Sequence, residues 1–91
     1  MTLTELNNEI EYHILKRDLP IDEERIPHVT ALVFESNYIE IYYKYGIATL
    51  HVVLEVLENH EIYEQCAVIK QTIDNINKLE KKKYPTTYEE T

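Results

Sequence analysis

The residues of this chain that could take part in chemistry are four histidines, one cysteine and a large number of tyrosines. Glutamate and histidine stand four residues apart at three places with a helical pattern, so each pair could offer two ligands to a metal ion. The pairs are Glu9 with His13, His51 with Glu55, and His60 with Glu64. Such pairs arise readily in glutamate-rich helices and match no common zinc signature. We therefore expect no metal site and no cofactor.

Nucleophilic catalysis would require Ser36 or Cys66 beside a histidine and a third group that orients the histidine. No local motif marks either residue. Cys66 stands about one turn inside its expected helix, away from the N-terminal amides that favour a thiolate. The chain has a single glycine, which excludes a glycine-rich phosphate loop. We therefore predict no catalytic residues and no enzyme activity.

The tyrosines are the most unusual feature, because the chain has eight of them against one Phe and no Trp. On a helix, Tyr38, Tyr42 and Tyr45 would share one face, with Glu35 and Glu40 near it. Tyrosine is favoured at interfaces because its rigid ring buries a large area while its hydroxyl tolerates water. We interpret these five residues, called the tyrosine face below, as a partner-binding surface, although some of the rings could also fill the core.

Apolar residues recur every three or four positions through most of the chain, which indicates amphipathic helices. Thr2, with Glu5 three residues later, predicts a capped helix over about 3–17, and Pro20 ends it. Gly46 suits a helix C-terminus, and two further helices are expected behind it, one ending near residues 59–60 and one over about 62–81. We predict an all-α fold: a small helical bundle with a C-terminal antiparallel hairpin, in one domain over 1–83, followed by a flexible tail over 84–91.

The segment 29–45 allows two interpretations. A helical stripe with Pro27 in its first turn is one of them. The β-branched and aromatic residues on both sides of Ser36 and Asn37 would also fit a β-hairpin, which would make the fold α+β. Ser-Asn is a poor two-residue turn because it lacks glycine, so we favour the helix.

The C-terminal hairpin resembles the UVR motif, a helical hairpin of bacterial excision-repair subunits and some stress-response proteins. The resemblance covers about residues 48–80 and follows the order Tyr63-Glu64, Cys66-Ala67, Ile69-Lys70-Gln71 and Ile73. Lys70 keeps the positive charge of the family's arginine, whereas Gln71 lacks the family's acid. The resemblance implies a protein-docking or oligomerisation hairpin without catalytic residues. Read physically, five residues pack the hairpin, with small side chains allowing close approach: Tyr63, Cys66, Ala67, Ile69 and Ile73.

The formal charge of −8 is unevenly distributed. Residues 1–27 hold seven acids and three bases, residues 28–65 hold six and one, and residues 66–91 hold four and five. Nucleic-acid binders need clustered Lys and Arg, so we expect no direct contact with DNA or RNA. An acidic surface favours a basic protein partner instead. The single cysteine, and the lack of a signal-like or membrane-spanning run, predict a cytoplasmic protein that does not contact membranes.

Our leading functional hypothesis follows from this charge. It is a non-enzymatic protein that inhibits or regulates a basic, nucleic-acid-binding partner, such as an enzyme, by occupying its groove as a nucleic-acid mimic. In size and charge the chain is similar to small acidic inhibitors encoded by phages, including anti-CRISPR proteins, without a shared motif. The alternative is a UVR-like adaptor or oligomerisation module that acts through hairpin pairing, for example as a homodimer.

Overall fold

The structure of this protein is a computed structural model that describes residues 2–83, with side chains described as far as residue 79. The described part contains no strand and consists of helices, in the order α1 (Leu3–Lys16), the short 3-10 turn η1 (Glu23–Arg25), α2 (Ile26–Phe34), α3 (Tyr38–Tyr45), α4 (Ile47–Asn59) and α5 (Tyr63–Lys83). The all-α prediction is confirmed, and the alternative of a β-hairpin in 29–45 is wrong. The predicted tail over 84–91 lies outside the described residues.

Helix α1 begins and ends where its sequence signals predict. The Thr2 hydroxyl accepts a hydrogen bond of 3.1 Å from the backbone amide of Glu5, which satisfies one of the free donors at the helix start. Leu6, Ile10 and Ile14 are buried and form the apolar stripe that packs against the rest of the domain. The helix stops at Lys16, one residue before the expected end.

The segment 29–45 is helical but interrupted, so the expectation of one continuous helix is wrong. Helix α2 ends at Phe34, and Ser36 takes a positive φ of 57°. The amide of Asn37 then donates to the carbonyl of Leu32 (2.9 Å), and the amide of Ser36 donates to Val33 (3.0 Å). These two bonds are the Schellman pattern, which closes a helix and redirects the chain. The same pattern follows α1 and α4, with Asp18 and Glu61 at positive φ.

Helix α4 is the central element of the fold, because it contacts α1, α3 and α5. Its position matches its sequence, which is apolar on more than one face. Six of its residues are buried: Thr49, Leu50, Val52, Val53, Val56 and Leu57. Gly46 joins α3 to α4 with φ 94° and ψ 170°, a conformation essentially restricted to glycine.

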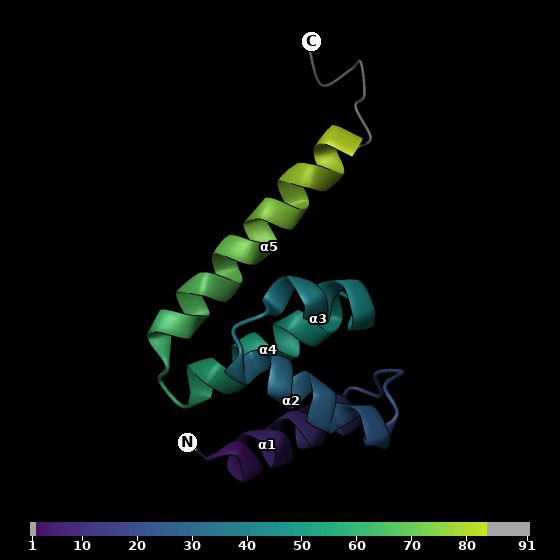
Figure 1. The fold of residues 1–91 in the computed structure, drawn as a ribbon, viewed down its shortest axis with the longest axis vertical. Coiled ribbons are helices and arrows are strands. Elements are labelled where there is room, and N and C mark those ends of the chain that lie inside the picture. Colours follow the sequence, from purple (N-terminus) through teal and green to yellow (C-terminus); the bar gives the residue numbers. More distant parts are fainter. Residues whose placement is uncertain (1, 84–91) are drawn as a thin grey trace.

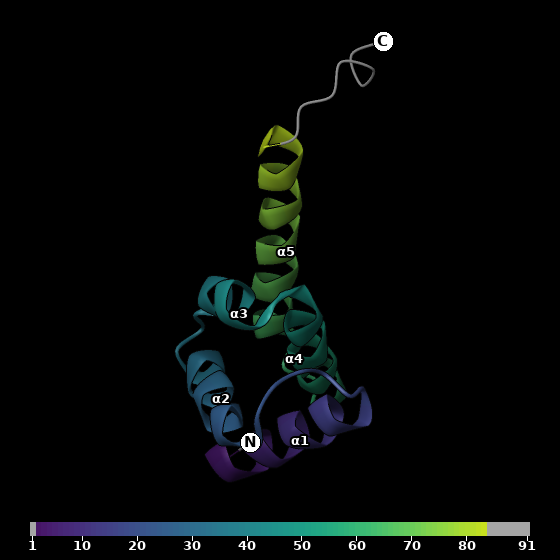
Figure 2. The same cartoon turned by 90° about the vertical axis from the view of Figure 1, so that its right-hand side faces the viewer.

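Helix α5 folds back on α4 through a short connection at residues 60–62 and contacts both α4 and α3. Figures 1 and 2 show its C-terminal half rising away from the other helices, which gives the molecule its elongated outline of 50 × 28 × 21 Å. A helix of 21 residues is about 31 Å long, half as long again as the 13-residue α4, so part of it extends beyond the body. Ile76 is still buried, whereas Leu79 is 58% exposed.

The residues expected to pack the hairpin divide into two groups. Cys66 and Ile69 are buried, and Ile73 is half-buried against the core, as predicted. Tyr63 is 64% exposed and Ala67 is exposed. The predictions that the Tyr63 ring packs near the turn and that Ala67 lies where the two helices approach are therefore wrong. The physical reason is helical register: Tyr63 and Ala67 are four residues apart on the outer face of α5, and the inner face follows Cys66, Ile69, Ile73 and Ile76.

Candidate functional site

The three tyrosines of the tyrosine face, Tyr38, Tyr42 and Tyr45, do lie on one side of α3, but that side is turned inward. The ring of Tyr38 is 1% exposed, and Tyr42 and Tyr45 are half-buried against the core. The expectation that Tyr38 offers a surface to a partner is therefore wrong. Its ring is part of the buried core, and its hydroxyl reaches Gln65 on α5. An aromatic ring buries a large apolar area, which favours its place in a small core.

The outer side of α3 carries different residues. Tyr43 is 69% exposed and Ile39 is 38% exposed. Glu40 forms an ion pair of 3.6 Å with Lys44, one turn further on, which neutralises its charge locally. Glu35 lies beyond the end of α2, is exposed and forms no ion pair with a described residue. Of the predicted partner-binding residues, Glu35 is thus the one whose charge is free on the surface.

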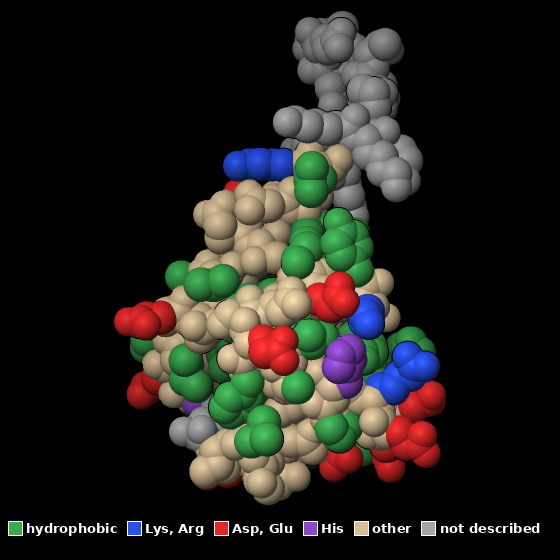
Figure 3. Space-filling view, viewed as in Figure 1, with side chains coloured by type: hydrophobic (Ala, Val, Ile, Leu, Met, Phe, Trp, Pro, Cys, Tyr) green, Lys and Arg blue, Asp and Glu red, His purple; other side chains and the backbone are tan. Residues whose placement is uncertain are grey.

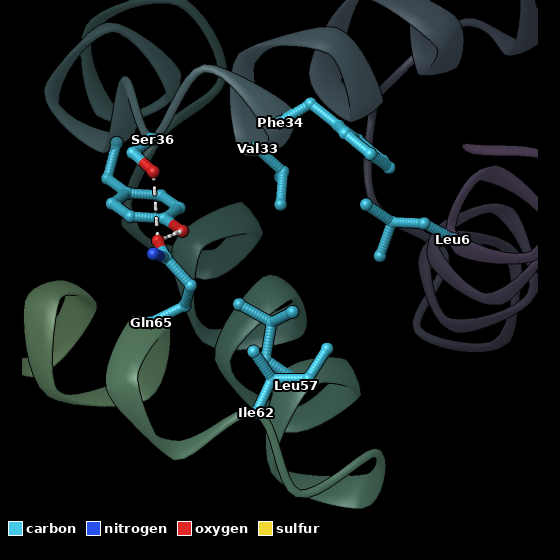
Figure 4. A pocket seen from close by; sticks show the side chains of 8 residues that line it. Leu6, Val33, Phe34, Ser36, Leu57, Ile62 and Gln65 are labelled. Atoms are coloured by element: carbon cyan, nitrogen blue, oxygen red, sulfur yellow. Dashed lines mark hydrogen bonds between the residues drawn. The ribbon is translucent and has the colours of Figure 1, made fainter. Parts of the chain in front are cut away.

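A groove opens between the C-terminal end of α2 and the turn that joins α4 to α5, and sequence reasoning did not find it (Figure 4). Its volume is about 240 Å³. The lining residues come from α1, the α2–α3 junction, α4 and the start of α5, and are Leu6, Val33, Phe34, Ser36, Tyr38, Leu57, Ile62 and Gln65. We call this feature the Gln65 groove. No motif marks it in the sequence, because its residues come from four separate segments.

The polar edge of the Gln65 groove is held by hydrogen bonds. The side-chain oxygen of Gln65 accepts a bond of 2.9 Å from the Ser36 hydroxyl and one of 2.5 Å from the Tyr38 hydroxyl, as the dashed lines of Figure 4 show. Burial raises the pKa of the Tyr38 phenol, and contact with Ser36 partly opposes this. The phenol therefore stays protonated and can donate to Gln65 across the neutral pH range.

Cys66 follows Gln65 in the chain and lies on the buried side of α5. Burial raises the pKa of its thiol, with a further increase from the carboxylate of Glu58 and a smaller opposing effect from Lys70. A raised pKa keeps the thiol protonated and weakly nucleophilic near neutral pH. Cys66 is thus placed as a small core residue.

A row of ionisable side chains joins α1 to α4 and to the turn that follows it. His60 lies 3.4 Å from one carboxylate oxygen of Glu9, and His13 lies 4.0 Å from the other. His13 is also 3.9 Å from Glu55, which pairs with Arg17. Of the three pairs that sequence spacing suggested, only Glu9 and His13 lie within ion-pair distance, because Glu55 and His60 have other partners. Within the described residues no three ligating side chains are grouped so that they could hold a metal ion.

Apart from Glu5, whose carboxylate accepts a hydrogen bond from the Thr2 hydroxyl, the exposed acids without an ion-pair partner among the described residues form two groups. One is the acidic loop between α1 and α2, with Asp18, Asp22, Glu23 and Glu24. The other consists of three acids that neighbour groove-lining residues in the chain: Glu35 stands between Phe34 and Ser36, and Glu61 and Glu64 stand beside Ile62 and Gln65. We call these three acids the groove rim. Figure 3 shows acidic side chains gathered at the lower right, over the α1–α2 connection, and others at the left edge beside the α4–α5 turn.

Comparisons with known proteins add no relative. No protein-family model, no curated protein and no solved structure matches this chain. In the part of the chain that the structure describes, no helix is both long enough and apolar enough to cross a membrane.

Proposed function

We propose that this protein binds a basic protein partner through its acidic surface and catalyses no reaction. The observation that carries the proposal is the set of exposed acids in the acidic loop and at the groove rim, which form no ion pair with a described residue. Unpaired carboxylates on a rigid body attract a basic partner over a Debye length and speed its association.

The class of partner follows from the sign and density of this charge. Protein surfaces that are strongly basic are most often built to hold the phosphates of DNA or RNA. A compact acidic protein that occupies such a surface would compete with nucleic acid and so inhibit or regulate its partner. The helical scaffold supports this role, because a packed core holds the carboxylates in place and little ordering entropy is lost on binding.

The alternative adaptor function would pair the α4–α5 hairpin with a like hairpin. Its expected contacts, Ile69 and Ile73, pack against the core of their own domain. Pairing through these side chains would need the hairpin to open first.

Affinity capture with the tagged full chain tests the proposal. The protein is incubated at low salt with an extract of cells that express it, and bound polypeptides are identified by mass spectrometry after elution with salt or with duplex DNA. The expected result is a nucleic-acid-binding protein that both eluents release. Retention of no polypeptide, or retention that neither salt nor DNA disturbs, would count against the proposal. A variant with Asp22→Asn, Glu23→Gln and Glu24→Gln should retain less of the partner.

A further inference from the structure

The Gln65 groove has the size and lining of a socket for one side chain. Its volume of about 240 Å³ lies below the range of about 300–1,000 Å³ that is typical of small-molecule sites. Its walls include Leu6, Val33, Leu57 and Ile62 (Figure 4). Phe34 completes them and is 52% exposed, an unusual position for the only Phe of the chain. An aliphatic side chain would bury the outer part of this ring.

Gln65 gives the socket a polar contact of fixed direction. Its side-chain oxygen accepts hydrogen bonds from the hydroxyls of Ser36 and Tyr38, and the Tyr38 side chain is buried in the core. The amide nitrogen of Gln65 makes no hydrogen bond with a described residue, and the side chain is half-exposed. This amide nitrogen could therefore donate a hydrogen bond to a backbone carbonyl of a partner.

The exposed acids that stand beside groove-lining residues in the chain, and that form no ion pair with a described residue, add only negative charge. Glu35, Glu61 and Glu64 are exposed beside lining residues and form no ion pair with a described residue. Neither of the chain segments that supply this part of the groove, 33–38 and 57–65, contains a Lys or Arg. Glu58 in the second segment is neutralised by Lys70 at 3.5 Å. A ligand that fits must therefore be apolar at one point and positively charged around it.

We infer that the Gln65 groove binds an amphipathic segment of the basic partner, with one aliphatic side chain in the socket and flanking Lys or Arg side chains near the three rim acids. This inference rests on the proposed function and names the contact site within it. The binding mode is that of a short helix anchored in a groove, in which the apolar anchor supplies affinity and the charges supply orientation and on-rate. A second copy of this chain is a poorer ligand, because its net charge of −8 is of the same sign as the rim.

The test uses a defined probe and the full chain. The probe is a peptide of about 12 residues, three helical turns, made of leucine and lysine with the leucines on one face. Two matched control peptides are used: in the serine-lysine peptide every leucine is replaced by serine, and in the leucine-glutamate peptide every lysine is replaced by glutamate. Titrations are followed by two-dimensional NMR of the backbone amides, the methyl groups and the Gln65 side-chain amide. The inference predicts that only the leucine-lysine peptide shifts the methyl signals of Val33, Leu57 and Ile62 and the amide of Gln65.

Paired variants separate the socket from the bulk charge. Phe34→Ala should weaken binding of the leucine-lysine peptide at least about fivefold, whereas Tyr43→Ala, which removes a more exposed ring outside the groove, should leave it unchanged. The rim variant with Glu35→Gln, Glu61→Gln and Glu64→Gln should lose more affinity than the loop variant with Asp22→Asn, Glu23→Gln and Glu24→Gln, although each removes three charges.

Three results would overturn the inference. Equal losses in the rim and loop variants, or equal binding of the serine-lysine peptide, would show that charge alone attracts the probe; the proposed function would then stand without the groove. A peptide with the sequence of residues 76–91 that binds the groove more tightly than the probe would assign the site to this chain itself. Absence of binding by either lysine-containing peptide would count against both the inference and the proposed function.

Discussion

Replacement of Tyr38 tests whether the side of α3 that carries Tyr38, Tyr42 and Tyr45 faces the core. The side chain is 1% exposed and its hydroxyl donates to Gln65, so it makes two separable contributions. Tyr38→Phe removes only the hydrogen bond and should lower the free energy of unfolding by about 0.5–1.5 kcal/mol. Tyr38→Ala also removes the buried ring, and should lower it by about 3–5 kcal/mol.

These losses are large for so small a domain. A chain of 91 residues has a free energy of unfolding of about 5–14 kcal/mol, so Tyr38→Ala removes a substantial part of it. At about 4–8 °C per kcal/mol, the melting temperature should fall by at least about 12 °C. Urea titration and thermal melting followed by circular dichroism measure both quantities.

Tyr43 provides the matched control on the same helix. It is 69% exposed, so Tyr43→Ala should change the free energy of unfolding by less than about 0.5 kcal/mol. Similar losses for Tyr38→Ala and Tyr43→Ala would refute the packing described for α3. So would a Tyr38→Ala protein that stays within about 1 kcal/mol of the parent, because a ring on the surface would cost that little.

Further predictions concern the backbone and the titrating groups. Gly46→Ala should cost about 1–3 kcal/mol in urea titrations, because φ 94° and ψ 170° are strained for any side chain although no atom lies within 4 Å of the added carbon. Glu61→Gly should raise the free energy of unfolding by about 1 kcal/mol in the same assay, since φ 58° is strained for glutamate. The raised pKa values of Cys66 and Tyr38 mean that the folded state binds their protons more tightly than the unfolded chain does. The melting temperature should therefore stay constant up to about pH 8.5 and fall at higher pH. In the Cys66→Ala variant this fall should begin only towards about pH 10. A melting temperature that does not change with pH over this range would contradict the prediction.

Most of the helical architecture could be predicted from residue patterns. The capping pair Thr2 and Glu5 located the start of α1, and the apolar stripe from Ile62 onward located α5. Gly46 marked the boundary between α3 and α4, because this position needs a glycine. In each of these cases a local physical requirement was visible in the residue type itself.

The break between α2 and α3 could not be predicted in the same way. Helices that end in the Schellman pattern usually place glycine at the positive-φ position, and here Asp18, Ser36 and Glu61 take it. A pattern that shows no break predicts a single helix over 29–45, in which the faces of α2 and α3 would be continuous. Spacing within α3 correctly grouped the tyrosines on one face, but only the packing of α3 against α4 and α5 decides that this face points inward.

The candidate site depends on contacts between distant segments. The carboxamide of Gln65 accepts hydrogen bonds from Ser36 and Tyr38, which are more than 25 positions away in the chain. No local sequence pattern predicts these contacts. The negative charge of the site was visible in composition. The fold decides which acids form ion pairs, as Glu40 and Glu58 do, and which acids at the groove rim do not.

The salt dependence of binding tests the central claim most directly. The association constant of the full chain with its captured partner would be measured by calorimetry over a series of salt concentrations, with the rim variant in parallel. Our account predicts a steep linear fall of log affinity with log salt, and a shallower slope for the rim variant. An affinity that stays constant across the series, in parent and variant alike, would contradict recognition through the exposed carboxylates.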